Sequence, residues 1–344
     1  MAGIDEHGAG AKQAEGRAGA EAAAPPRSFA ARVARQVLPW LITAACFWFL
    51  YRRLDAAAAR AGTDVLPYLA GIFASVAWTR WLLLMVAYSC LFFLVDSLVL
   101  WRVVSWFNAP IPWRDLLPIR ASTYILSIVN EQVGKGAIAL YLNRTRGVPG
   151  WQIGSSMLFI MVCEFYYLAT WATAGALLRW NEVPRELVPL FHSIPLLAGG
   201  AWVLFAVFYR VVRSERFGES GLGRHPLLHT FRQARFHHYL LILLLRSPAL
   251  LAAVVVYSLA AHLFGVDLGV RAMLGFVPVV FFATLVPGPF RAVAVASWTL
   301  LVPDHPGAMA AFGLVQHNFF VLFNAAIGLL FLRRANRELF GARR

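Results

Sequence analysis

Long apolar stretches, separated by charged or proline-rich connections, follow one another along most of the chain. About 20 apolar residues are enough for a helix to cross the hydrocarbon layer of a bilayer, which is ~30 Å thick. The stretches lie, by residue number, at 37–50, 66–100, 119–142, 153–178, 191–209, 239–264, 273–302 and 308–332. The pattern therefore predicts an all-α polytopic membrane helix bundle with eight hydrophobic regions.

The second stretch, 66–100, is too long for one crossing, and Arg80 interrupts it. We expect the crossing helix near 81–101 and the preceding part along the membrane interface.

The third stretch, 119–142, has polar residues at its centre. They and the nearby glycines are Asn130, Glu131, Gln132, Gly134, Lys135 and Gly136. An ionised side chain at membrane depth is costly unless it is paired or hydrated, so such residues usually face a cavity. Each glycine weakens a helix by roughly 1 kcal/mol. We therefore expect the helix to break at this point and to leave backbone groups for a ligand.

The seventh stretch, 273–302, consists of two apolar halves joined by the sequence VPGPFR at 286–291. Prolines break a helix because they lack a backbone donor and their rings clash with the preceding turn. We take Pro287, Gly288 and Arg291 as candidate ligand contacts at this turn. The alternative is a plain kink between two short helices.

The basic residues favour a topology in which these two stretches enter and leave on the same side. If all eight stretches crossed, the arginine-rich loop at 210–235 would lie opposite the N-terminus. With two re-entrant stretches this loop joins both termini on the inside, as the positive-inside rule favours. We therefore expect about six full spans and two re-entrant or broken helical hairpins, which enter from opposite faces as in transporters with broken helices.

Three parts are expected along the chain. Residues 1–28 are rich in Ala, Gly and charge, which predicts a disordered cytoplasmic tail. Residues 29–335 form the membrane domain, and 336–344 form a basic C-terminal tail. With no cleavable signal peptide before the first span, the expected location is the bacterial inner membrane, with both termini cytoplasmic.

Composition supports the membrane class. The chain is 60% hydrophobic and 14% charged, and its net charge of +14 comes mainly from arginine. Arginines beside membrane spans favour contact with anionic phospholipid headgroups, whereas nucleic acid is not an expected partner. The cysteines lie in apolar runs without metal-binding spacing, and no metal or other cofactor is expected.

The central residues of the third stretch predict a headgroup site. Lys135 would hold a phosphate, and Glu131 an amine or a neighbouring arginine. The N–H groups near Gly134 and Gly136 would receive an anion. The alternative is a structural ion pair, since Glu131 and Lys135 are one helical turn apart.

Other polar residues in the apolar stretches are candidates with equally plain alternatives. Arg120 and Arg246 either face the site or extend to the interface. Glu164 is a partner of Lys135, a proton site or a protonated core residue. Asn318 lies in a polar notch, 316–318, that substrate contact and helix–helix contacts explain equally well.

No sequence motif of an enzyme is found: HExxH, the P-loop and GxSxG are all absent. The histidines of the basic loop are expected to be solvated. A transferase acting on a polyprenyl-linked substrate is one alternative function, although it needs an acid, base or metal cluster. A scaffold that recruits a lipid-synthesis enzyme through the arginine loop is another.

Two segments resemble a known family. They are NEQVGKGAIALYLNRTRGV at 130–148 and LVPGPFR at 285–291. Together with the order of spans over about 35–335, they are similar to the transmembrane region of lysylphosphatidylglycerol synthases, a family that includes flippase-like and hopanoid-associated membrane proteins. The chain departs from the family pattern at Ala137 and Ala139 and lacks the second glycine of the Pro-Gly turn. The resemblance implies movement of a membrane lipid or lipid-linked precursor between leaflets.

Overall fold

The computed structural model describes residues 29–129, 131–183, 185–221, 223–285 and 291–340, and these ranges contain helices and no β-strand. The α-helices are α2 (Phe29–Arg60), α3 (Val65–Ser75), α4 (Trp78–Phe107), α5 (Trp113–Val129), α6 (Glu131–Arg146), α7 (Gly150–Leu178), α8 (Val188–Val212), α9 (Glu215–Glu219), α10 (His229–Gln233), α11 (Phe236–His262), α12 (Val270–Thr284), α13 (Ala292–Leu301) and α14 (Pro306–Phe340). Two 3₁₀ turns, η1 (Arg185–Leu187) and η2 (Pro226–Leu228), complete the fold. The all-α prediction is confirmed.

Five helices are long and apolar enough to cross a membrane, namely α4, α7, α8, α11 and α14. They agree with the predicted stretches, although α14 continues to Phe340, beyond the expected domain limit at 335. Helix α2 has 32 residues and extends past the expected span 37–50 in both directions. The expected tails at 1–28 and 341–344 lie outside the described residues.

The long stretch 66–100 is divided as expected. The apolar helix α3 ends at Ser75, and α4 begins three residues later at Trp78. The Trp78 indole N–H donates to the Phe73 carbonyl oxygen at 3.0 Å, which ties the start of α4 to the end of α3. The position of α3 along the membrane interface stays a prediction.

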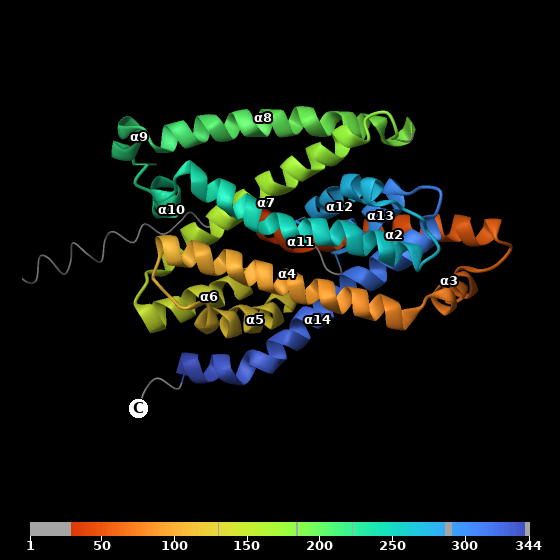
Figure 1. The fold of residues 1–344 in the computed structure, drawn as a ribbon, viewed down its shortest axis with the longest axis horizontal. Coiled ribbons are helices and arrows are strands. Elements are labelled where there is room, and N and C mark those ends of the chain that lie inside the picture. The colour runs from red at the N-terminus through yellow and green to blue at the C-terminus, as the bar shows by residue number, and fades with distance from the viewer. Residues whose placement is uncertain (1–28, 130, 184, 222, 286–290, 341–344) are drawn as a thin grey trace, which may run out of the picture.

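Two helical hairpins enter the bundle from opposite ends (Figure 1). Helices α5 and α6 pack together beside the half of α4 that ends at Phe107. At the other end, α12 runs back along α7, with Arg271 near Leu178 and Phe282 near Phe165. Helix α13 then returns to the same end beside α14. The turns, at 130 and 286–290, lie outside the described residues.

The basic segment with α9, η2 and α10 lies at the same end of the bundle as the last turns of α14 (Figure 1). The α5–α6 hairpin enters from this end too. The two hairpins therefore give the arrangement of connections that the distribution of arginines predicted.

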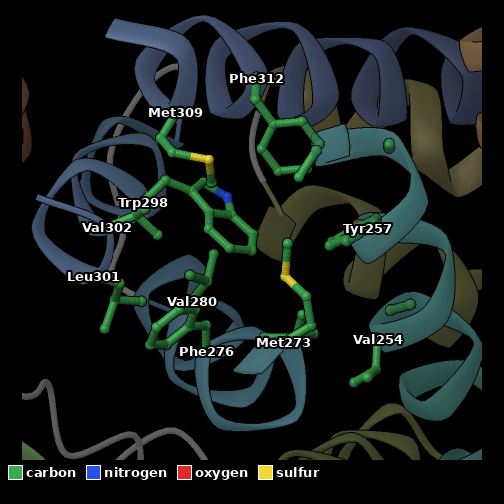
Figure 2. Close-up of a cluster of buried hydrophobic side chains, with 14 of the residues drawn as sticks. Val254, Tyr257, Met273, Phe276, Val280, Trp298, Leu301, Val302, Met309 and Phe312 are labelled. Atoms are coloured by element: carbon green, nitrogen blue, oxygen red, sulfur yellow. The ribbon is translucent and has the colours of Figure 1, made fainter. Parts of the chain in front are cut away.

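An aromatic cluster joins the α12–α13 hairpin to α11 and α14 (Figure 2). The rings of Trp298 and Phe312 are 5.2 Å apart, and the Tyr257 ring lies 6.0 Å from Phe312. Trp298 and Phe312 are fully buried. Edge-on aromatic pairs contribute about 0.5–1.5 kcal/mol beyond area burial, so they hold the short helix α13 in place.

Helices α7 and α12 approach closely where two glycines face each other. A Cβ atom on Gly175 would clash with the Leu274 carbonyl oxygen and lie 2.7 Å from the Gly275 Cα atom. Small residues let helices of membrane proteins pack with their backbones in contact. The position of α12 therefore depends on Gly175.

We expect Gly175→Ala to lower the free energy of unfolding by about 1–3 kcal/mol, because the added methyl group overpacks the α7–α12 contact. Gly199→Ala is the matched control, since a Cβ atom on this α8 glycine meets no other atom within 4 Å. Detergent-mediated unfolding of the purified protein measures the difference. Equal stability of the two variants would contradict the close packing.

Candidate binding site: a buried charge cluster

Four charged side chains from four helices meet inside the bundle. They are Asp96 of α4, Arg120 of α5, Glu164 of α7 and Arg246 of α11, and we call them the charge cluster. Each belongs to a helix that is otherwise mostly apolar, and folding brings them together from distant positions in the chain. Charged groups at this depth are costly unless they are paired.

Asp96 and Arg120 form the tightest contact. The Arg120 Nε–H donates to Asp96 Oδ2 at 2.6 Å, and the Tyr124 hydroxyl donates to the same oxygen at 2.6 Å. Arg120 and Tyr124 are one turn apart on α5, so both reach α4 from the same face. The Arg120 guanidinium also lies 4.7 Å from the centre of the Tyr124 ring. This contact anchors the α5–α6 hairpin to α4.

Arg246 bridges the two carboxylates. Its Nη1 donates to Glu164 Oε1 at 3.2 Å, and its Nη2 lies 3.8 Å from Asp96 Oδ1. Its Nε atom is buried without a hydrogen-bond partner among the described residues. The Arg246 side chain is only 9% exposed. Arg246 is therefore buried with part of its hydrogen-bonding capacity unused.

The cluster combines two guanidinium groups and two carboxylates, which balances their formal charges. Burying an ion pair costs several kcal/mol, which is recovered only when geometry and additional hydrogen bonds are good. Asp96 has these bonds and its side chain is 9% exposed, whereas that of Glu164 is 31% exposed and bonds Arg246 alone among the described contacts. Of the two carboxylates, Glu164 is thus the one whose contact with Arg246 costs less to break.

Three predicted site residues, Arg120, Glu164 and Arg246, are brought together by the structure. The alternative in which Arg120 extends to the interface is wrong, because Asp96 holds it inside the bundle. Glu164, for which Lys135 was one expected partner, pairs with Arg246. Asp96 was not among the candidates. A lone acidic residue in an apolar stretch was the signal that could have found it.

The expected break at the glycines of the third stretch is not found. Helix α6 begins at Glu131 and continues without interruption past Gly134, Lys135 and Gly136. A glycine costs a helix only about 1 kcal/mol, which packing against α5 and α7 overrides. Gly136 is exposed, with open space around it.

Several predicted contacts cannot be placed in this site. Asn130, Pro287 and Gly288 lie outside the described residues, as do the side chains of Glu131 and Lys135. Asn318 is partly exposed, and its Nδ2 donates to the Leu314 carbonyl oxygen of its own helix at 2.7 Å.

Arg291 lies in a separate polar region. It has left-handed backbone angles, φ 48° and ψ 38°, immediately before α13. A non-glycine residue in this conformation is strained and is often found at functional sites. Its guanidinium lies 5.8 Å from the centre of the Phe320 ring of α14.

Comparisons with protein-family models, with curated proteins and with solved structures find no match to this chain. The fold and the charge cluster define its class, which is a polytopic α-helical membrane protein with a charged centre in its interior.

We expect Asp96→Asn to cost about 3–5 kcal/mol of stability, since it leaves two buried arginines with one carboxylate. Glu164→Gln should cost clearly less, because that side chain is partly exposed. Thermal unfolding of the purified variants measures both effects.

The double variant Asp96→Asn/Arg120→Gln separates lost charge pairing from lost packing. It should be less destabilised than the sum of its two single variants, because the second change removes the unpaired charge. Simple additivity would argue against the ion pair.

Proposed function

We propose that the protein moves a membrane lipid or lipid-linked precursor between the two leaflets by holding its polar headgroup at the charge cluster. The observation that carries this proposal is the incomplete pairing of Arg246, a buried guanidinium with an unbonded Nε beside a partly exposed carboxylate. Spontaneous crossing of lipids is slow because the headgroup must leave water. A charged group inside the bundle lowers that cost.

The unbonded Nε of Arg246 gives the charge cluster a place to bind a headgroup. A guanidinium binds phosphate oxygens through two adjacent N–H groups, and the Nε and Nη2 of Arg246 provide such an edge. A phosphate on this edge would compete with Asp96 for Nη2, whereas Glu164, which is bonded to Nη1, would stay beside it and could pair with an amine of the headgroup. Asp96 and Arg120 would stay paired and keep the helices in position.

The two hairpins support a path from both faces. Helix α5 carries Arg120 into the bundle from one end, and the α12–α13 hairpin carries Arg291 in from the other. Irregular backbone is tolerated at membrane depth where protein or water surrounds it. Glu131 and Lys135 remain predicted headgroup contacts near the turn of the first hairpin.

The basic end of the bundle supports an orientation. The positive-inside rule would place the segment with α9 and α10 on the cytoplasmic side of a bacterial inner membrane. Its arginines would attract anionic phospholipids, or a lipid-synthesis enzyme that presents acidic residues. No contact among the described residues favours the alternative of a transferase.

We expect Arg246→Gln to slow lipid exchange at least about tenfold, which corresponds to a loss of about 1.4 kcal/mol of headgroup stabilisation. The assay follows fluorescent phosphatidylglycerol and phosphatidylethanolamine in proteoliposomes of the full-length protein. Arg102→Gln is the matched control, since Arg102 is an exposed arginine of α4 that stacks on Trp101 outside the cluster.

Two results would overturn the proposal. One is wild-type protein that gives no exchange above empty vesicles with either lipid. The other is equal exchange by the Arg246→Gln and Arg102→Gln variants. Glu164→Gln, which disturbs the partly exposed side of the cluster, provides a second test if Arg246→Gln fails to fold.

A further inference from the structure

Helix α14 has a second polar feature, which the charge cluster does not use. Gln316, His317 and Asn324 are 1%, 2% and 5% exposed, and we call them the α14 polar strip. Each has one buried atom without a hydrogen-bond partner among the described residues: Gln316 Oε1, His317 Nε2 and Asn324 Oδ1. A buried polar atom left unbonded costs about 1–3 kcal/mol, and native proteins bond nearly all of them. Three on one helix therefore indicate a missing partner.

Polar groups of other helices lie beside Gln316 and His317, at the end of the strip nearest the start of α14. The Gln316 amide donates to the Tyr257 hydroxyl of α11, and the Tyr257 ring lies 5.3 Å from that of Tyr88 on α4. The Arg291 guanidinium lies 5.8 Å from the centre of the Phe320 ring, which is 6.1 Å from the Tyr88 ring. Side chains of α4, α11 and α14, together with Arg291 just before α13, thus form one polar layer.

This layer lies at a different depth from the charge cluster. Tyr88 precedes Asp96 by eight residues on α4, and Tyr257 follows Arg246 by eleven on α11. At 1.5 Å per residue, both spacings place the layer about 12–16 Å nearer the end from which the α12–α13 hairpin enters. His317 and Asn324, seven residues apart, share one face of α14 and extend the strip along the helix.

The three unbonded atoms of the strip determine which kind of ligand group can bind there. The amide oxygens of Gln316 and Asn324 only accept hydrogen bonds, and an imidazole nitrogen accepts or donates. A metal cation is disfavoured by the positive charge of Arg291, and an apolar ligand would leave the three atoms unbonded. A hydroxyl group donates to an amide oxygen and either donates to or accepts from an imidazole nitrogen, so separate hydroxyl groups along the strip satisfy all three atoms.

We propose that the α14 polar strip is a binding site for hydroxyl groups in the membrane interior, distinct from the charge cluster. The hydroxyl groups come either from ordered water or from the polyol of a lipid headgroup such as glycerol. The polyol source rests on the proposed function, whereas hydration of the strip does not. In both cases the strip forms a polar layer that the α12–α13 hairpin helps to build.

Hydroxyl-radical footprinting of the full-length protein tests the site, because labelling of a buried side chain requires water beside it. In nanodiscs of phosphatidylethanolamine, Tyr257 and His317 should be labelled several-fold more than Phe312 and Met273, after correction for intrinsic reactivity. These two controls are fully buried in the neighbouring apolar cluster. Labelling of Tyr257 and His317 no higher than that of the controls would overturn the proposal.

A second lipid distinguishes the two sources. In nanodiscs that also contain phosphatidylglycerol with the same acyl chains, unchanged labelling identifies water, and a loss of labelling identifies the glycerol headgroup. The double variant Gln316→Leu/Asn324→Leu should lose the labelling in phosphatidylethanolamine. Asn318→Leu, at a partly exposed site on the same helix that bonds only its own backbone in the described contacts, should keep it. Full labelling of the double variant would also overturn the proposal.

The Arg246→Gln variant separates this site from the proposed function. It should lose lipid exchange but keep the labelling of Tyr257 and His317, because it lies in the other polar layer. Labelled wild-type protein that exchanges no lipid would remove the proposed function and leave the hydroxyl site intact.

Discussion

The pairing of Asp96 with Arg120 is the interaction on which the interior of the bundle depends. Neither group is stable alone in an apolar interior, so each requires the other. Because Arg120 lies on α5, this requirement holds the α5–α6 hairpin against α4. Arg246 adds α7 and α11 through Glu164 and Asp96. Burying these charges costs free energy, and the need to pair them therefore determines which helices pack together.

Close backbone packing allows the hairpins to lie within the bundle. A Cβ atom on Gly328 of α14 would lie 2.7 Å from the Ala121 carbonyl oxygen of α5, and Gly175 has the same role between α7 and α12. Each hairpin thus lies in a groove made by the absence of a side chain on a long helix. Protein atoms therefore cover one face of each hairpin, and irregular backbone at membrane depth is tolerated where protein or water covers it.

Hydropathy predicted the long helices, and the distribution of arginines predicted which stretches form hairpins. The first stretch was predicted to end at residue 50, whereas α2 continues to Arg60. Both arginines lie on α2 over the rings of Trp48 and Phe49, so the helix continues past them. The pairing inside the site could not be predicted, because no local pattern links Arg246 to Glu164, 82 positions away.

The two polar layers differ in a way that fits two different ligands. The charge cluster balances ions against ions, whereas the α14 polar strip offers neutral acceptors and one imidazole. Phe92 lies between Tyr88 and Asp96 on α4, and Phe320 lies between His317 and Asn324 on α14; their ring centres are 4.8 Å apart. Such a pair contributes only about 0.5–1.5 kcal/mol beyond its burial. The α14 polar strip therefore continues past this aromatic pair, from His317 to Asn324, toward the depth of the charge cluster.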